Sequence, residues 1–164
     1  MATNSIDTKY AVFGLGKTGL SCVRFFARQG TAVTVIDSRD QPPELGPFLE
    51  SFPATALMLG EPLPQSLGQC KHLILSPGVP RSHPFVAAAI QCGIEVIGDI
   101  ELFARHAKAP ILAVTGSNGK STVVTMVTEI LASAGINVSS GGNLGTPALD
   151  LLRGGEQPGC FVLE

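Results

Sequence analysis

The sequence has little charge and almost no excess of either sign. Charged residues make up 15% of its 164 residues and apolar residues 45%, and 11 basic and 13 acidic side chains leave a formal net charge of -2. Because disordered chains combine low hydrophobicity with high charge, this composition excludes an intrinsically disordered protein. It also excludes the broad positive field that attracts nucleic acid, so we expect no nucleic-acid partner and a local site for any bound anion.

Long apolar runs and an export signal are also absent. The apolar runs at residues 94–97 and 111–114 are far shorter than the roughly 20 residues that span a bilayer. Residues 1–8 lack the basic stretch followed by an apolar stretch that marks a signal peptide. We therefore expect a cytoplasmic protein with no membrane insertion, and we expect a monomer.

Cysteines at metal-ligand spacing are lacking too. The four cysteines, Cys22, Cys70, Cys92 and Cys160, form no CxxC pair, and no neighbouring histidine completes a zinc pattern. Disulfides are rare in the cytosol, and a cysteine among apolar neighbours packs as a small hydrophobic residue. We expect reduced thiols in the core.

The sequence does contain glycines and prolines at regular intervals. The 19 glycines and 12 prolines fall between apolar segments, and short apolar runs alternate with segments of helical periodicity. The first strands are expected at residues 10–13, 32–36, 56–59, 72–75 and 94–97, and the first helices at residues 18–29, near Phe48 and at residues 85–92. Strands that alternate with helices imply right-handed crossovers, so we expect a Rossmann-like domain with a mainly parallel sheet over residues 1–98.

The same pattern starts again after an expected linking helix at residues 99–107. Further strands are expected at residues 111–115, 137–140 and 160–164, and a helix at residues 120–134. The last run has the composition of a central strand cut at its carboxyl end. We therefore expect an α/β fold throughout, in which residues 99–164 are the truncated beginning of a P-loop-type ATP-binding domain.

A glycine-rich turn joins the first expected strand to the first expected helix. Residues 14–19 (GLGKTG) match the pattern G-x-G-x-x-G, and Asp37 ends the next strand. The glycines allow a tight turn, the approach of a diphosphate and close packing of the helix, whose N-terminus supplies hydrogen-bond donors. Asp37 can then hold the ribose of NAD, or Ser38 and Arg39 behind it can bind the edge of a different base. A glycine turn that serves packing alone is the third interpretation.

A second glycine turn is more specific. Residues 115–122 (TGSNGKST) nearly match the P-loop pattern G-x-x-x-x-G-K-[ST], but Val114 stands where the first glycine belongs. We therefore expect the loop to turn at Gly116 and to offer a short cradle of backbone N–H groups. Lys120 can bridge the β- and γ-phosphates of ATP, and Ser121 can offer its hydroxyl to Mg²⁺. The candidate ATP-binding residues are Gly116, Ser117, Asn118, Gly119, Lys120, Ser121 and Thr122, with Lys120 as the catalytic candidate.

Together the motifs resemble the Mur ligase family. Residues 115–122 are similar to the family's ATP loop, T-G-[TS]-N-G-K-[TS], which also lacks the first P-loop glycine, and residues 141–145 (GGNLG) are similar to its G-G-N-[IL]-G turn. The segments at residues 14–21, 76–78, 98–103 and 162–164 are similar to segments in one branch of the family. The resemblance extends over nearly the whole chain.

This resemblance implies that the first domain holds a UDP-sugar and not a dinucleotide. The implied substrate contacts are Leu15, Lys17 and Thr18 at the diphosphate, Asp37, Ser38 and Arg39 at the uracil edge, Ser76, Pro77 and Gly78 in the facing turn, and Asn143 from the second domain. The implied Mg²⁺ ligands are Ser121 and Glu164.

The resemblance also implies a reaction, which is ATP-dependent amide formation through an acyl phosphate. The implied substrates are UDP-N-acetylmuramoyl-L-alanine, D-glutamate and ATP, with Mg²⁺, in the cytoplasmic synthesis of peptidoglycan precursors. The chain stops before the family's downstream histidine, its carbamylated lysine and its C-terminal amino-acid-binding domain. We therefore expect these 164 residues to bind ligands but not to ligate them.

Two other functions fit parts of the sequence. An NAD-dependent dehydrogenase explains the first glycine turn but leaves the Gly-Lys-Ser loop without a role. A non-enzymatic P-loop nucleotide-binding module explains that loop but not the first turn with Asp37. The related folylpolyglutamate synthetases share the ATP loop but have no Rossmann-like domain before it.

Overall fold

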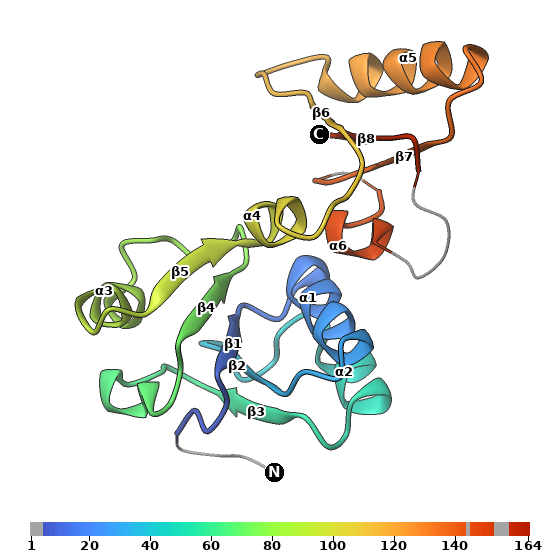
Figure 1. Ribbon diagram of the computed structural model, residues 1–164. Helices are drawn as coiled ribbons and strands as arrows, with labels where there is room; N and C mark the ends of the chain where they lie inside the picture. Colours follow the sequence, from blue (N-terminus) through green and yellow to red (C-terminus); the bar gives the residue numbers. More distant parts are fainter. Residues whose placement is uncertain (1–4, 144, 153–157) are drawn as a thin grey trace. The chain divides into compact units, whose positions relative to one another are not determined.

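The computed structural model describes residues 5–143, 145–152 and 158–164. The chain divides into two compact units, Met1–Asp99 and Ile100–Glu164. Both units are built from parallel strands and helices, as the cartoon in Figure 1 shows. The α/β class with mainly parallel sheets is therefore confirmed.

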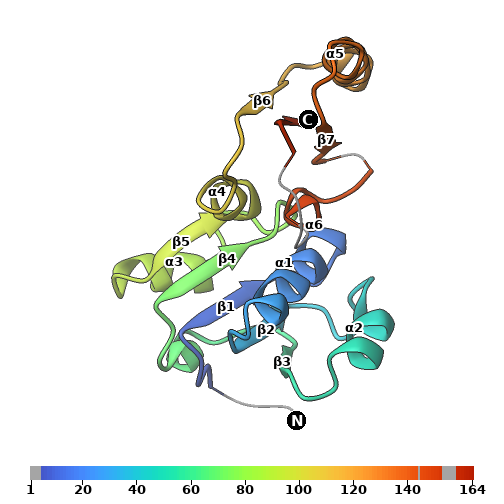
Figure 2. The same cartoon turned by 45° about the vertical axis from the view of Figure 1, so that its right-hand side comes forward.

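The first unit is a five-stranded parallel sheet with helices on both faces (Figures 1 and 2). Its elements are β1 (Tyr10–Phe13), α1 (Lys17–Arg28), β2 (Val33–Asp37), α2 (Leu45–Ser51), β3 (Ala56–Leu59), the 3-10 turn η1 (Pro64–Leu67), β4 (His72–Leu75), α3 (Pro84–Gln91) and β5 (Glu95–Gly98). The strand order is β3-β2-β1-β4-β5. The connections therefore reverse direction between β1 and β4, and this switch point is where open α/β sheets bind ligands.

Two apolar clusters cover the two faces of this sheet. One contains Val35 of β2 with Val23 of α1 and Phe48 of α2. The other contains Ile36, the next residue along β2, with Phe85 of α3. Successive strand side chains point to opposite faces, so a strand that is buried on both sides needs an unbroken apolar run. β2 is buried along its whole length, and before Asp37 only Thr34 interrupts its apolar run. The Thr34 hydroxyl shares a hydrogen bond of 2.8 Å with the Thr8 hydroxyl.

The second unit has three parallel strands in the order β6-β8-β7. Its elements are α4 (Asp99–Ala104), β6 (Ile111–Ala113), α5 (Lys120–Ser133), β7 (Val138–Gly141), α6 (Ala148–Leu151) and β8 (Cys160–Leu163), with the first residue of α4 belonging to the first unit. β8 is central and fully buried, as its sequence predicts, and Phe161 packs edge-to-face on Phe103 at a centroid distance of 5.0 Å.

Apart from one-residue shifts at helix ends, the α-helices differ from expectation at α4 and α6. α4 ends at Ala104, three residues before the predicted end, because the chain closes into a tighter turn in which the His106 N–H bonds to the Phe103 carbonyl. The four-residue helix α6 falls in a stretch for which no element was predicted. Helices this short are held by tertiary contacts and carry no periodic signal.

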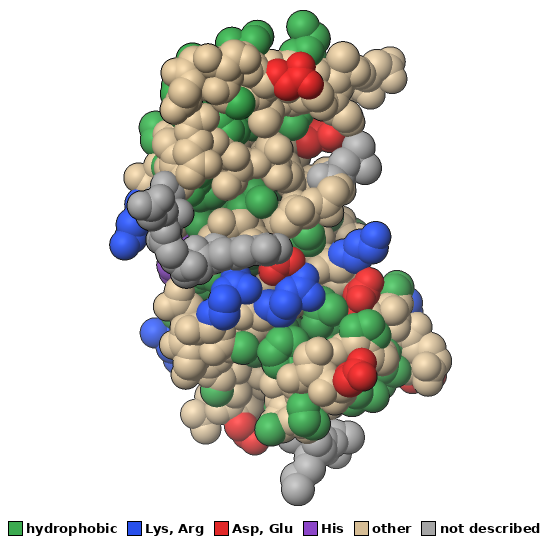
Figure 3. Space-filling model, turned by 90° about the vertical axis from the view of Figure 1, so that its right-hand side faces the viewer, with side chains coloured by type: hydrophobic (Ala, Val, Ile, Leu, Met, Phe, Trp, Pro, Cys, Tyr) green, Lys and Arg blue, Asp and Glu red, His purple; other side chains and the backbone are tan. Residues whose placement is uncertain are grey.

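The second unit leaves an apolar stripe exposed. α5 has no buried residue, and its side chains Val123, Met126 and Ile130 are 45%, 55% and 65% exposed. Their spacing places them on one face of the helix. Figure 3 shows hydrophobic side chains at the surface of this unit, at the top of the view.

The four cysteines are thiols, and three of them, Cys22, Cys70 and Cys160, are buried. Burial raises the pKa of Cys70 to about 11, so this thiol stays protonated at neutral pH. Cys92 is exposed, contrary to the expectation of four core thiols, because it caps the C-terminus of α3. In the described part of the chain, no helix is both long and apolar enough to cross a membrane.

Substituting Gly19→Ala tests the packing of α1 on β1. A Cβ at Gly19 would fall on the carbonyl oxygen of Gly14, well inside contact distance, so α1 would have to move. We expect the free energy of unfolding to fall by about 3 kcal/mol in urea titrations. Gly46→Ala in α2 is the control, because a Cβ there meets nothing within 4 Å and should leave stability unchanged or slightly raised. Equal stabilities for the two variants would contradict this account of the packing.

Candidate functional site

The first candidate site is the turn that joins β1 to α1. Gly14 has φ +102, a left-handed conformation that favours glycine, and its N–H bonds to the Ile36 carbonyl at 2.8 Å. Gly16 is the N-cap of α1, and no side chain caps this helix end. The first N–H groups of a helix have no partner within the helix, so this N-terminus can donate hydrogen bonds to an anion.

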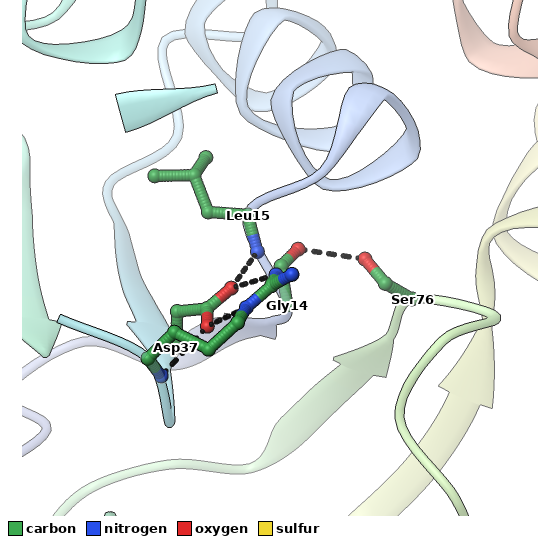
Figure 4. A network of polar contacts seen from close by, with 5 residues as sticks. Gly14, Leu15, Asp37 and Ser76 are labelled. Atoms are coloured by element: carbon green, nitrogen blue, oxygen red, sulfur yellow. Dashed lines mark hydrogen bonds and ion pairs between the residues drawn. The ribbon is translucent and has the colours of Figure 1, made fainter. Parts of the chain in front are cut away.

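Asp37 ties this turn to the end of β2. Its carboxylate accepts hydrogen bonds from the Leu15 N–H at 2.7 Å and from Arg39, through the backbone N–H at 3.0 Å and through Nε and Nη2 at 2.8 Å each. Figure 4 shows the carboxylate between these donors. Burial alone would raise the pKa of Asp37, but the hydrogen bonds from Arg39 and Leu15 outweigh it and hold the pKa below its usual range.

Ser76 approaches the same turn from the other side. It follows β4 and is buried, and its hydroxyl donates to the Gly14 carbonyl at 2.7 Å (Figure 4). Its own N–H continues the strand ladder to the Phe13 carbonyl at 3.0 Å. Ser76 therefore spans the switch point between β1 and β4.

The structure brings nine of the ten predicted UDP-substrate residues to the carboxyl edge of the first sheet. They are Leu15, Lys17 and Thr18 after β1, Asp37, Ser38 and Arg39 at the end of β2, and Ser76, Pro77 and Gly78 after β4. Lys17, Ser38, Arg39, Pro77 and Gly78 are exposed at this edge. Their contacts with a ligand stay a prediction.

Leu15 differs from the others because its side chain, its N–H and its carbonyl already have partners within the protein. Its side chain is fully buried in the cluster with α1 and α2, its N–H bonds to Asp37, and its carbonyl accepts the Glu44 N–H at 3.3 Å. Leu15 therefore connects the turn to the core.

The second candidate site is the loop that joins β6 to α5. Val114 still belongs to the sheet, because its N–H bonds to the Leu163 carbonyl at 2.8 Å. The loop then passes through Gly116, with φ +154, and Gly119, with φ +75, which is the N-cap of α5. The chain turns after the strand, as the replacement of the first P-loop glycine by Val114 predicts.

Three polar side chains meet at the end of this loop. Ser121 Oγ donates to Glu164 Oε2 at 2.9 Å, and Lys120 Nζ lies 3.7 Å from Glu164 Oε1. Glu164 follows the central strand β8, and its side chain is only 6% exposed. A hydroxyl and a carboxylate are oxygen donors of the kind that Mg²⁺ prefers, and Mg²⁺ needs few protein ligands because it keeps most of its waters. The residues therefore fit the predicted ion.

Asn143 lies in the turn after β7, beside the backbone of Glu164. A Cβ at the preceding residue, Gly142 with φ +121, would lie 2.7 Å from the Glu164 carbonyl oxygen, so glycine allows this close approach. The Asn143 N–H bonds to that oxygen at 3.4 Å. Among the described residues only glycines have positive φ, so Asn143 is not there to adopt a left-handed conformation. The predicted contact of its side chain with a substrate stays a prediction.

Two connections in these sites carry no signal in the sequence. Ser76 and Gly14 are 62 residues apart, and Ser121 and Glu164 are 43 apart. The motifs identify the individual residues, but only the strand order makes them neighbours. A serine directly after a strand is too common to identify its partner.

The acid dependence of stability tests the role of Asp37. Because its pKa is lowered in the folded state, the native protein binds fewer protons than the unfolded chain as the pH falls. Its stabilisation is therefore present above about pH 4 and is lost as the pH falls through the folded pKa. We expect Asp37→Asn to lower the free energy of unfolding by about 2 kcal/mol at pH 7.

The difference between Asp37→Asn and the original chain should shrink towards pH 3 in urea titrations. A constant difference across this range would show that the charge of Asp37 contributes nothing.

Comparison with known proteins agrees with these features. A family model described as "Mur ligase MurD-like, N-terminal domain" matches residues 8–98. Proteins named UDP-N-acetylmuramoylalanine--D-glutamate ligase are 50% identical over 153 residues in Haemophilus ducreyi and 52% identical over 153 residues in Pseudomonas putida. Each match covers 93% of this chain but 34% of the relative, so the chain spans about a third of the length of the curated relatives it matches.

Solved structures share the fold at low sequence identity. A murein peptide ligase from Psychrobacter arcticus 273-4 superposes with a TM-score of 0.59 at 19% identity, over 96% of this chain and 37% of that chain. The UDP-N-acetylmuramate-alanine ligase MurC from Thermotoga maritima superposes with a TM-score of 0.53 at 20% identity, over 95% of this chain and 36% of that chain. The family model covers more than half of the sequence, and the resemblance of the motifs is thereby confirmed: the chain belongs to the Mur ligase family, with a MurD-like N-terminal domain.

Proposed function

We propose that this chain carries the UDP-sugar site and the beginning of the ATP site of a ligase that adds D-glutamate to UDP-N-acetylmuramoyl-L-alanine. Residues 1–98 would bind the UDP-sugar, and residues 99–164 would begin the ATP-binding domain. The observation that carries the proposal is the meeting of Lys120, Ser121 and Glu164 in the second unit. A dehydrogenase has no use for a second phosphate site of this kind.

The state of Asp37 supports a UDP-sugar over NAD in the first unit. A dehydrogenase needs a carboxylate that can accept the ribose hydroxyls. Here both carboxylate oxygens already accept hydrogen bonds, and the Arg39 guanidinium covers them from the solvent side. Arg39 remains 53% exposed and Ser38 is exposed, so both can bind the carbonyl edge of uracil while the N-terminus of α1 binds the diphosphate.

The second loop supports ATP as the phosphoryl donor. Backbone N–H groups from Gly116 to Lys120 would bind the phosphates, and the Lys120 ammonium would neutralise the charge that develops on the γ-phosphoryl group. Ser121 and Glu164 would hold Mg²⁺, which supplies further neutralisation when it is bound. The L-alanine carboxylate would attack the γ-phosphorus of ATP and release ADP, which forms an acyl phosphate. The amine of D-glutamate would then attack the acyl carbon, and inorganic phosphate and a proton would leave as the amide forms.

The isolated chain would bind these ligands without joining them. It spans 34% of its relatives' length, and no residue for binding the incoming amino acid is identified among those described. We propose that the ligase works as a monomer in the cytoplasm, in the synthesis of peptidoglycan precursors. It would have no nucleic-acid partner and no membrane insertion.

Calorimetric titration with UDP-N-acetylmuramoyl-L-alanine tests the assignment of the first unit. We expect binding of this ligand, and we expect no heat from NAD⁺ titrated in parallel, because Asp37 is already bonded to Leu15 and Arg39. Binding of NAD⁺ but not of the UDP-sugar would contradict the proposal and assign Gly14 and Asp37 to the NAD site of a dehydrogenase.

Substitution of Lys120 tests the second unit. We expect Lys120→Ala to weaken the binding of ATP in the presence of Mg²⁺ by about tenfold, because a charge-assisted contact to phosphate is lost. Lys108→Ala removes an exposed lysine from the same unit and should leave binding unchanged. Neither variant nor the original chain should release phosphate when all substrates are supplied. Equal ATP affinity in the two variants would exclude Lys120 from the phosphate site.

A further inference from the structure

We infer that Ser76 is a positioning residue, which fixes the orientation of one peptide group in the diphosphate turn and does not itself need to touch the ligand. The inference rests on the proposed function, in that it takes the turn before α1 as the diphosphate site. Ser76 belongs to the turn that faces this site, but its hydroxyl is directed at the protein.

The peptide group between Gly14 and Leu15 is held at both ends. The Gly14 carbonyl and the Leu15 N–H belong to the same planar unit and point in opposite directions because the peptide is trans. Ser76 Oγ donates to the carbonyl at 2.7 Å, and Asp37 Oδ2 accepts from the N–H at 2.7 Å. Figure 4 shows the two side chains on opposite sides of this peptide group, each coming from a different strand end.

This peptide group needs such restraint because it follows a glycine. Gly14 has φ +102, and a residue without Cβ can exchange between several backbone conformations at little cost. Rotation of the peptide would move Gly16 and the first turn of α1, which carry the donors for the diphosphate. Two hydrogen bonds from opposite sides prevent this rotation.

The Gly14 carbonyl also has little choice of partner. It lies against Gly19, where a Cβ would overlap it, and a Cβ at Gly19 would lie 3.1 Å from Ser76 Oγ. The carbonyl therefore points into the narrow space between α1 and the end of β4. A buried carbonyl without a partner is costly, so loss of the Ser76 hydroxyl would drive the peptide to reorient.

The surroundings leave no room for a larger residue at position 14. A Cβ at Gly14 would lie 2.8 Å from Ser76 Cβ and 3.0 Å from Val79 Cγ2. Gly14, Gly19 and Ser76 therefore form one packing unit at the switch point between β1 and β4. The fold uses the glycines for space and the serine for the hydrogen bond.

Ser76→Ala, compared with Ser66→Ala, tests the inference in the 164-residue chain. Ser66 is also buried, and its hydroxyl also donates to a backbone carbonyl, that of Leu63 at 2.6 Å, but it lies in η1 at the opposite edge of the sheet. We expect both variants to lose stability in urea. Only Ser76→Ala should bind UDP more weakly in calorimetry, by about tenfold.

A second pair of variants separates the hydroxyl from the shape of the side chain. Thr and Val have nearly the same shape, so Ser76→Thr and Ser76→Val differ chiefly in the hydroxyl. We expect the threonine variant to bind UDP more tightly than the valine variant. Hydrogen exchange of the Leu15 amide, measured by NMR without ligand, should be faster in Ser76→Ala and Ser76→Val than in Ser66→Ala.

The outcomes distinguish this inference from the proposed function. If the original chain does not bind UDP, the proposed function fails, and amide exchange still reports on the peptide. If it binds UDP and Ser76→Ala binds as tightly as Ser66→Ala, with unchanged exchange at Leu15, Ser76 has no positioning role and the inference is wrong.

Discussion

The buried carboxylate of Asp37 is the group on which the first unit's functional edge depends. A charge with a side chain only 2% exposed is stable only when hydrogen-bond donors replace the water it has lost. Arg39 and the Leu15 N–H provide these donors, and in doing so they connect the end of β2 to the turn after β1. The residues of β2 before Asp37 are all buried, and their packing places this carboxylate at the carboxyl end of the strand. The geometry of the turn after β1 therefore depends on the need to satisfy one buried charge.

Parallel pairing explains why each unit places its polar groups together. In a parallel sheet all strands end at the same edge, so side chains that follow different strands become neighbours. In the first unit this brings Ser76 and Asp37 to either side of Gly14. In the second unit it brings Glu164, after β8, to the loop that begins α5. The same arrangement thus yields two candidate sites of different character within one chain.

The two glycine turns differ in how they are held. The first is fixed from both neighbouring strands through a serine and an aspartate, and its helix packs closely because Gly19 lacks a Cβ. In the second, Val114 stays in the sheet and the loop residues from Thr115 to Gly119 are exposed, with Lys120 and Ser121 directed to Glu164. The first turn is suited to presenting backbone donors in a fixed position. The second adds the Lys120 ammonium and the side-chain oxygens of Ser121 and Glu164, which are groups that a phosphoryl-transfer site needs.

The sequence by itself determined the features that are local in the chain. The bounds of β1, β3 and β4 agree with the predicted runs, and both glycine turns lie between a strand and a helix as predicted, because periodicity and glycine conformation act over a few residues. The motifs also identified the family. The helix α6 and the turn η1 were missed, since four residues show no period. Only the tertiary structure decided the strand order β3-β2-β1-β4-β5, and with it the bonds from Ser76 to Gly14 and from Ser121 to Glu164. These bonds join residues 62 and 43 positions apart, so they form only after the sheets have assembled and brought the strand ends together.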